Sequence, residues 1–317
     1  MSNPPSQADQ PAAGAEGLLR NLVRLNTAQL QITRNLQAAF LDLRNAIVRE
    51  QTRDLQQCHP NPLCRFGAKY FSQADEDGIT LEILRRIALP GPGVFAEFGP
   101  GDGTENNSLI LAALGWRGFW VGNEELRFDL AGIPPETLTY LRDQVTLENL
   151  ADLTAQGLRS LGAEHIDVVS FDFDGNDIYF LEALLERGIA PALFIVEYNG
   201  KFPPPIRFQV TYDPDFRWAS DDYMGASLCS MNDLFERFGY KLVCCNAHTG
   251  NNAFFVQNRF AGLFPEVPDS IDAIFSEPRY HLYTGYAHPT SPLTLRKLFE
   301  RPAAASPAPR VPERVAP

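Results

Sequence analysis

The protein has 317 residues, 44% of them hydrophobic, enough to bury one large domain with appendages or two small ones. Its 27 basic and 39 acidic residues leave a formal charge of −12, which disfavours nucleic acid as a partner because phosphates would be repelled. No run of about 18 apolar residues, the length of a membrane span, occurs, and the N-terminus lacks the pattern of a secretory signal. The five cysteines form no CxxC pair, so we expect a soluble cytoplasmic protein.

Both chain ends are rich in Pro, Ala and Ser and poor in large apolar groups, which predicts disordered tails. Between the tails we expect one α/β core with helical additions on either side of it. The predicted segments are a tail at 1–16, a long helix at 17–57, a helical entry segment at 58–90, a core at 91–260, a cover segment at 261–301 and a tail at 302–317.

The predicted long helix, residues 17–57, contains no proline, and its apolar residues recur at alternating steps of four and three. This seam consists of Leu18, Leu22, Leu25, Gln29, Ile32, Leu36, Ala39, Leu43 and Ala46. Such spacing is typical of a coiled coil, in which a polar residue like Gln29 sets the register. Two interpretations stay open: a helix that joins copies of the chain into a homo-oligomer, or an amphipathic helix lying on its own domain.

From residue 79 onward, apolar strands and helices alternate, which predicts a mainly parallel, doubly wound sheet with helices on both faces. The expected strands are 94–99, 118–122, 145–149, 166–173 and 192–199, followed by a hairpin of 240–246 and 252–257. The expected helices are 79–87, 104–114, 137–144, 150–162, 179–188 and 231–239. The Pro-rich stretch 200–227 is dense in aromatic residues, so we expect an ordered loop over the site rather than disorder.

The first core strand runs into the sequence EFGPGDGTENNS, in which Glu97 is followed by Gly99, Gly101 and Gly103. Glycines allow positive φ and let a ligand lie against the main chain, at the sheet edge where doubly wound folds bind ligands. The dinucleotide fingerprint G-x-G-x-x-G requires glycine where Thr104 stands, which disfavours a nicotinamide cofactor. The remaining E-x-G-x-G-x-G pattern favours S-adenosylmethionine, whose positive charges suit Glu97; a tight turn without a ligand is the alternative.

Acidic and amide side chains gather where the fourth and fifth predicted strands end. On an ideal strand Asp172 and Asp174 share one face, as do Glu197 and Asn199, so the four could converge. Their oxygens suit a hard cation such as Mg²⁺, Mn²⁺ or Ca²⁺, which would orient an acceptor and lower the pKa of its hydroxyl. The alternatives are that DGND, starting at Asp174, is only a turn, or that Asp174 or Asp177 acts without metal as a base or ligand contact.

Among the histidines, His248 is the best candidate for a general base. It lies in the turn of the predicted hairpin, which should emerge at the same edge as the glycine turn. A histidine in a loop is also commonly a solvated side chain without a catalytic role. The sequence leaves these two interpretations open.

Four stretches in order resemble the FkbM-type methyltransferases, an uncharacterised bacterial branch of that family in particular. They are YFSQADEDGI (70–79), FAEFGPGDG (95–103), HIDVVSFDFDGND (165–177) and LFIVEYN (193–199). The resemblance implies a class I methyltransferase fold and methyl transfer from S-adenosylmethionine to a hydroxyl of a sugar or another small molecule. It also implies an acid at the end of the second strand for the cofactor's ribose, where this chain has Gly122; Glu124 or Glu125 could substitute.

The sequence therefore predicts an S-adenosylmethionine-dependent O-methyltransferase that binds neither nucleic acid nor membrane, with Mg²⁺ or Mn²⁺ as the candidate metal cofactor. A rival hypothesis is a non-catalytic scaffold of the same fold, and a second is a nicotinamide-dependent enzyme.

Overall fold

The structure is a computed structural model that describes residues 10–89, 92–279 and 291–299, in two units comprising residues 1–54 and 55–317. Helix α1 (Gln10–Cys58) begins at Gln10, earlier than the predicted start at residue 17. The predicted tail at 302–317 lies outside the described residues. None of the described helices has the length and apolar character needed to cross a bilayer.

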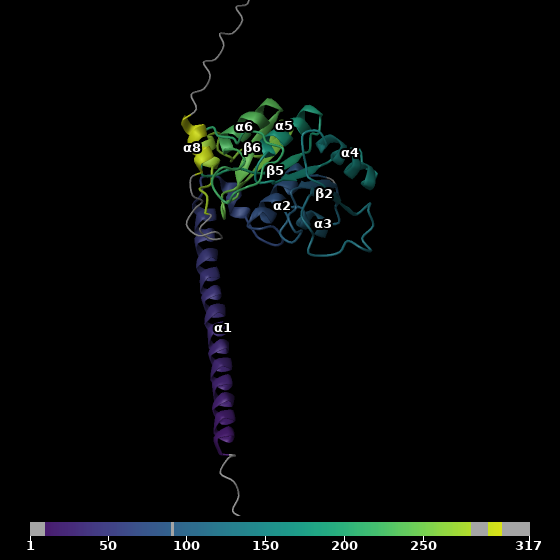
Figure 1. Ribbon diagram of the computed structural model, residues 1–317. Helices are drawn as coiled ribbons and strands as arrows, with labels where there is room; N and C mark the ends of the chain where they lie inside the picture. The colour runs from purple at the N-terminus through teal and green to yellow at the C-terminus, as the bar shows by residue number, and fades with distance from the viewer. Residues whose placement is uncertain (1–9, 90–91, 280–290, 300–317) are drawn as a thin grey trace, which may run out of the picture. The chain divides into compact units, whose positions relative to one another are not determined.

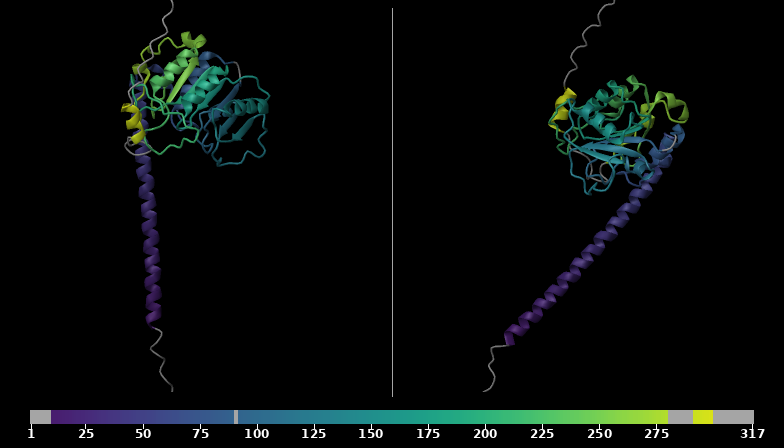
Figure 2. Two further views of the ribbon diagram at one scale, coloured as in Figure 1. Left: turned by 45° about the horizontal axis from the view of Figure 1, so that its top comes forward. Right: turned by 90° about the vertical axis from the view of Figure 1, so that its right-hand side faces the viewer.

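A seven-stranded sheet forms the centre of the second unit (Figures 1 and 2). Its strands are β1 (Val94–Phe98), β2 (Arg117–Gly122), β3 (Leu138–Arg142), β4 (Val168–Phe171), β5 (Leu193–Glu197), β6 (Tyr240–Cys245) and β7 (Asn252–Gln257). They lie in the order β3-β2-β1-β4-β5-β7-β6, and β7 is antiparallel to both of its neighbours. The expected doubly wound, mainly parallel sheet with a closing hairpin is confirmed.

Helices cover both faces of this sheet. The described helices of this unit are α2 (Glu76–Ile87), α3 (Leu109–Ala113), α4 (Leu150–Leu161), α5 (Asp177–Glu186), α6 (Leu228–Arg237), α7 (Ile271–Ile274) and α8 (Pro292–Phe299), with 3-10 helices η1 (Pro62–Phe66) and η2 (Asn258–Leu263). Helices α4, α5 and α6 lie side by side on one face, and α2 and α3 lie on the other (Figure 1). Every residue of β1, β4 and β5 is buried, as expected for central strands covered on both faces.

Two element predictions are wrong. Residues 137–144 contain strand β3 rather than a helix, since Thr139 and Tyr140 favour a strand and β2 offers a parallel edge to pair with. Residues 145–149 are a turn rather than a strand, because Thr146 and Asn149 bond to each other: the Thr146 amide donates to Asn149 Oδ1 at 2.8 Å. The chain thus turns into α4 immediately after β3.

The order of the central strands decides where a ligand can bind. Strand β1 pairs with β2 on one side and with β4 on the other. The strands that follow β1 are therefore added on one side of it up to β3, and from β4 onward on the other side. The loops after these two strands therefore diverge and leave a crevice at the carboxyl edge of the sheet. The glycine turn and the predicted acidic residues both follow strands that end at this edge.

Candidate functional site

A cavity of about 500 Å³ opens at the carboxyl ends of the parallel strands. A neighbouring cavity of about 580 Å³ shares Gln73, Gly99, Gly101 and Asp172 with it. Most residues that line the first cavity come from the carboxyl ends of β1 to β5, from the loops after these strands and from the segment 200–227. They include Gly99, Gly101, Gly122, Asn123, Glu124, Asp143, Gln144, Val145, Asp172, Phe173, Asp174, Glu197, Phe216, Arg217 and Trp218.

The three glycines after β1 all have positive φ, of 81° at Gly99, 53° at Gly101 and 84° at Gly103. A Cβ on Gly99 would overlap the carbonyl oxygen of Asp172, and one on Gly103 would lie 2.9 Å from the Phe128 ring. No atom lies within 4 Å of a Cβ built on Gly101, which lines both cavities. Packing thus accounts for two of the glycines, and Gly101 is the one of the three with open space beside its main chain at the cavity wall.

Glu97 is buried, and its carboxylate bonds to the loop ahead of α3. Its Oε1 accepts from the Asn107 amide at 3.0 Å, and its Oε2 accepts from the Ser108 amide at 3.2 Å and from the Ser108 hydroxyl. Burial raises the pKa of Glu97, while the hydroxyl of Ser108 opposes that rise. Glu97 therefore holds the loop ahead of α3 in place, and it also borders the second cavity.

Glu97→Gln should lower the thermal stability, because the amide group of glutamine brings N–H donors against the amides of residues 107 and 108. A loss of about 2 kcal/mol is expected for leaving buried donors without an acceptor, or roughly 4–8 °C in Tm. Circular dichroism melts compare it with Glu105→Gln, an exposed acid of the same loop whose ion pair with Lys69 contributes little. Equal Tm values for the two variants would show that the Glu97 carboxylate does not stabilise the loop.

The end of β2 lacks an acid for a packing reason. A Cβ on Gly122 would lie 2.8 Å from Cδ of Pro100 in the glycine turn, so no acidic side chain fits there. Glu124 is exposed and lines the cavity, whereas Glu125 is not among the lining residues. Of the two candidate substitutes, Glu124 is therefore the one at the site.

Asp143, Gln144 and Val145 line the same cavity, and sequence reasoning missed them. They were missed because residues 137–144 were assigned to a helix; once β3 is recognised, they directly follow a parallel strand. The amide of Asp143 donates to the Gly122 carbonyl at 2.8 Å, which fixes this loop beside the end of β2.

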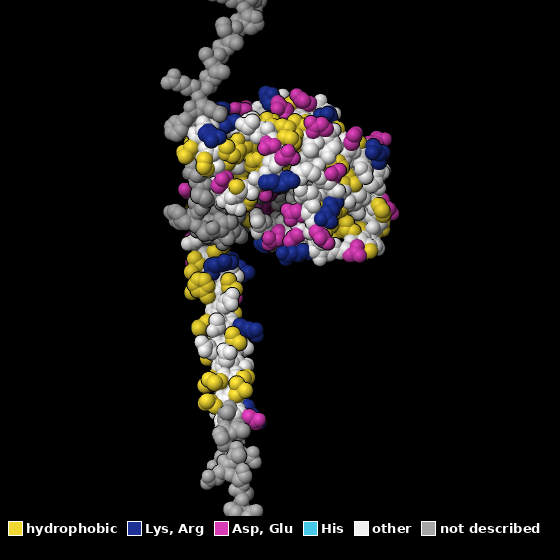
Figure 3. Space-filling model, viewed as in Figure 1, with side chains coloured by type: hydrophobic (Ala, Val, Ile, Leu, Met, Phe, Trp, Pro, Cys, Tyr) yellow, Lys and Arg dark blue, Asp and Glu magenta, His cyan; other side chains and the backbone are white. Residues whose placement is uncertain are grey.

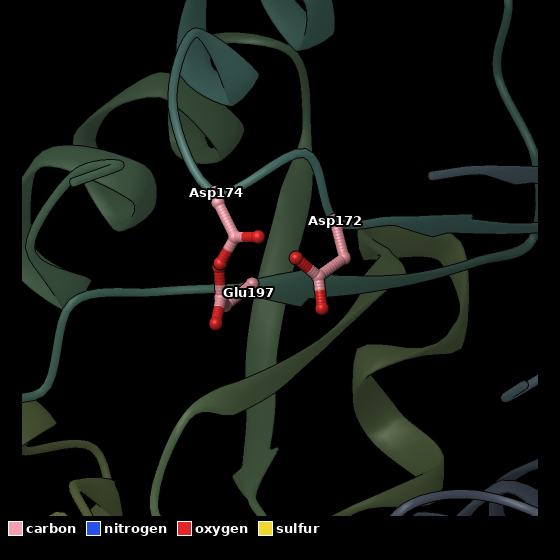
Figure 4. A group of neighbouring side chains, drawn as sticks. All are labelled: Asp172, Asp174 and Glu197. Atoms are coloured by element: carbon pink, nitrogen blue, oxygen red, sulfur yellow. The ribbon is translucent and has the colours of Figure 1, made fainter. Parts of the chain in front are cut away.

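Three carboxyl groups converge in the cavity, those of Asp172, Asp174 and Glu197 (Figure 4). One oxygen from each lies within 4.8 Å of the others. Burial raises the pKa of Asp172 and of Glu197 well above the usual range, and the neighbouring carboxylates add to both shifts. Burial also raises the pKa of Asp174 to about 6, with further contributions from Asp177 and Glu124. A cation placed among the three groups would relieve this repulsion.

Asp172 and Asp174 come together through a turn and not, as expected, through strand alternation, because β4 ends at Phe171. Asp174 has φ 57°, a left-handed conformation that Asp tolerates better than most residues. Asp177 holds this turn: its carboxylate accepts from the amides of Phe173 at 2.7 Å and Gly175 at 2.9 Å. The DGND stretch is therefore a turn, and it is the turn that aims Asp174 into the cavity.

Asn199 is held away from the acidic group. Its side-chain nitrogen donates to the carbonyls of Asp222 at 2.9 Å and Met224 at 3.0 Å, and its oxygen accepts from the Lys201 amide at 3.1 Å. These bonds tie the start of the 200–227 loop to its end. Asn199 thus anchors this loop, and it is not among the residues that line the cavity with the three carboxyl groups.

His248 is not among the residues that line either cavity. Its backbone amide donates to Asp75 Oδ1 at 3.1 Å, and burial lowers the pKa of its imidazole. The hairpin instead contributes Thr249 and Asn251 to the first cavity and Asn252 to the second. The structure therefore does not bring His248 together with the three carboxyl groups.

Asn252 is a further residue that sequence reasoning missed. It is the first residue of β7 and pairs across the sheet with Glu197. Its side-chain nitrogen donates to Glu76 Oε1 at 3.0 Å, while its Oδ1 is buried without a hydrogen-bond partner. Asn252 lines the second cavity together with Asp172, one of the three acidic residues of the first cavity.

The segment 200–227 packs as an ordered loop, as predicted. Phe202, Phe208 and Val210 form a small buried cluster against which Phe216 and Tyr223 pack. The rings of Phe202 and Phe208 stack with centroids 3.9 Å apart. Phe216, Arg217 and Trp218 of this loop line the cavity and give it an aromatic wall, in which Phe216 lies against Gly175, the residue after Asp174.

No protein-family model matches the chain, and no curated protein matches it significantly. Among solved structures it is similar to a precorrin-6y C5,15-methyltransferase from Geobacter metallireducens, with 15% identity and a TM-score of 0.34, over 60% of this chain and 90% of that one. It is also similar to a SAM-dependent methyltransferase from Agrobacterium tumefaciens, with 11% identity and a TM-score of 0.32, over 58% and 62% of the two chains. TM-scores below 0.5 do not establish a shared fold, so the fold rests on the strand order described above.

Proposed function

We propose that the protein is an S-adenosylmethionine-dependent methyltransferase that acts on a hydroxyl of a small molecule or sugar. The observation that carries the proposal is that the glycine turn after β1 and the three carboxyl groups after β4 and β5 line one cavity. A methyl donor on the turn and an acceptor near the acids would then meet in a single chamber, as in-line displacement requires.

The residues around the turn fit the cofactor. Gly101 leaves its main chain open at the cavity wall, and Glu124 offers a carboxylate just beyond β2, where the ribose hydroxyls need an acceptor. Asp143, Gln144 and Val145 would border the adenine, since they follow the next strand of the sheet. Bound there, the cofactor supplies an electrophilic methyl group.

The acidic group fits a divalent ion such as Mg²⁺ or Mn²⁺. Asp172, Asp174 and Glu197 would bind it through carboxylate oxygens, and the unpaired Oδ1 of Asn252 is an amide oxygen of the same hard type at the adjoining wall. The ion would lower the pKa of an acceptor hydroxyl held beside it. Without an ion, Asp174 is the group best placed to take the hydroxyl proton, because its pKa of about 6 is close to neutral pH.

The aromatic wall of the 200–227 loop favours an acceptor with an apolar or ring-shaped body. Phe216 and Trp218 would cover that body and exclude water, while the carboxyl groups in the same cavity hold its hydroxyl. Exclusion of water matters because water would compete for the reactive methyl group.

Isothermal titration calorimetry with S-adenosylmethionine tests the proposal, performed with and without Mg²⁺ on the full chain. We expect binding in both conditions, and a change in affinity upon EDTA treatment that Mg²⁺ or Mn²⁺ reverses. No heat in either condition would reject the enzyme and favour a scaffold of the same fold. A rise in melting temperature with NADH, and none with S-adenosylmethionine, would favour a nicotinamide-dependent enzyme instead.

A further inference from the structure

Helix α1 carries an apolar surface that its own unit has no means to cover. Within residues 10–54 the described structure is one continuous helix, so no second layer exists in this unit against which apolar side chains could pack. Leu25 is 63% exposed, Leu36 67% and Phe40 67%, and apolar side chains are visible along the helix in Figure 3. A helix with this much exposed apolar surface is typical of one that associates through it.

The apolar residues follow the geometry of a two-helix or multi-helix seam. From Leu18 to Ala46 the seam advances 28 residues, which is four repeats of seven. Leu22, Leu36 and Leu43 occupy one core position of the repeat and Leu18, Leu25 and Ile32 the other. Four uninterrupted heptads are long enough to specify a coiled coil.

The charges and the single polar core residue identify the partner as an identical helix. Arg20, Arg24, Arg34 and Arg44 all fall at positions that point away from the seam, so two copies can approach without arginines facing one another. Gln29 lies within the seam, where its amide can donate to and accept from the same amide of a second copy. Only a parallel, in-register pairing places Gln29 opposite itself.

We propose that residues 18–47 form a parallel, in-register coiled coil with the same segment of further copies of this chain. Leu19, Phe40 and Ile47 flank the seam on one side and widen its apolar face, which favours more than two helices. The association brings several copies of the chain together, independently of which reaction the α/β unit catalyses.

The test compares the full chain with two matched double variants by size-exclusion chromatography with light scattering. Leu25→Glu with Leu36→Glu places charges in the seam, whereas Leu30→Glu with Leu41→Glu makes the same change outside it on exposed leucines. We expect a multiple of 35.3 kDa for the unaltered chain and for the off-seam variant, and 35.3 kDa for the seam variant. A 35.3 kDa mass for the unaltered chain, or equal dissociation of both variants, would overturn the proposal.

Two further measurements examine the partner and the orientation. Gln29→Cys in a Cys58→Ser background should form a cross-linked dimer upon oxidation with diamide, since a parallel seam juxtaposes the two thiols; Cys58 is replaced because it is exposed. The absence of the cross-link in an assembled protein would contradict the parallel register. Co-sedimentation of a monomeric chain with phosphatidylglycerol vesicles would show instead that the helix lies on a membrane surface, and would likewise overturn the proposal.

Discussion

Gly101→Val is expected to abolish S-adenosylmethionine binding while leaving the protein folded. The position is the one glycine of the turn whose Cβ would project into open space, and it lines both cavities. A valine side chain would therefore occupy the volume that the cofactor requires, without colliding with the protein. Calorimetry should detect no heat of binding, compared with a measurable affinity for the unaltered chain.

The control for this variant is Gly115→Val. Gly115 has φ 82°, its added Cβ meets no atom within 4 Å, and it does not line either cavity. Both variants carry a similar backbone cost of about 1–2 kcal/mol for a left-handed residue with a side chain, so both should melt at similarly reduced temperatures. Cofactor binding by Gly101→Val at the affinity of Gly115→Val would remove the glycine turn from the proposed site.

Asp174→Asn is expected to reduce turnover by about 100-fold or more, whether the carboxylate binds a metal ion or takes the proton itself. Asparagine is the appropriate replacement because it tolerates the positive φ of 57° at this position, which alanine does not tolerate well. The loss of activity would then report on the charge of Asp174 and not on the turn. The turnover rate is measured as the formation of labelled product from radiolabelled S-adenosylmethionine and an acceptor identified beforehand.

Asp215→Asn is the matched control, since Asp215 is exposed on the loop after β5 and does not line the cavity. Its rate should equal that of the unaltered chain. The same assay tests whether a metal ion takes part. EDTA should inhibit both the unaltered chain and Asp215→Asn if the three carboxyl groups bind an ion. An unchanged rate for Asp174→Asn would show that the DGND stretch serves only as a turn and takes no part in the reaction.

The alternation of apolar strands and helices was sufficient to predict the sheet, its closing hairpin and the position of the glycine turn. These features depend on local periodicity and on glycine, which act over a few residues. The periodicity gave wrong predictions at residues 137–149, which are short segments of mixed polarity. It predicted a helix where β3 lies and a strand where the chain turns. Pairing with β2 decides that β3 is a strand, and this pairing joins residues about 20 positions apart.

The roles of individual polar residues were harder to predict. Glu97 and Asn199 were expected to contact ligands, and in the structure both also bind the protein: Glu97 bonds to the loop before α3, and Asn199 to the loop after β5. Asn252 was not suspected, although its Oδ1 is buried without a hydrogen-bond partner and the residue lines the second cavity with Asp172. The residue type of a carboxylate or amide does not indicate whether its hydrogen-bond partners come from the protein or from a ligand.

The sequence by itself determined the fold class, the bare main chain after β1 and the acidic residues that follow β4 and β5, because each follows from residue type and spacing along the chain. Only the tertiary structure decided which of these side chains remain available to a ligand. That depends on hydrogen-bond acceptors and packing atoms brought from distant segments, such as Pro100 against Gly122 and the carbonyls of Asp222 and Met224 around the Asn199 side chain. Buried polar groups must be satisfied, and the folded chain alone fixes which of them the protein satisfies itself.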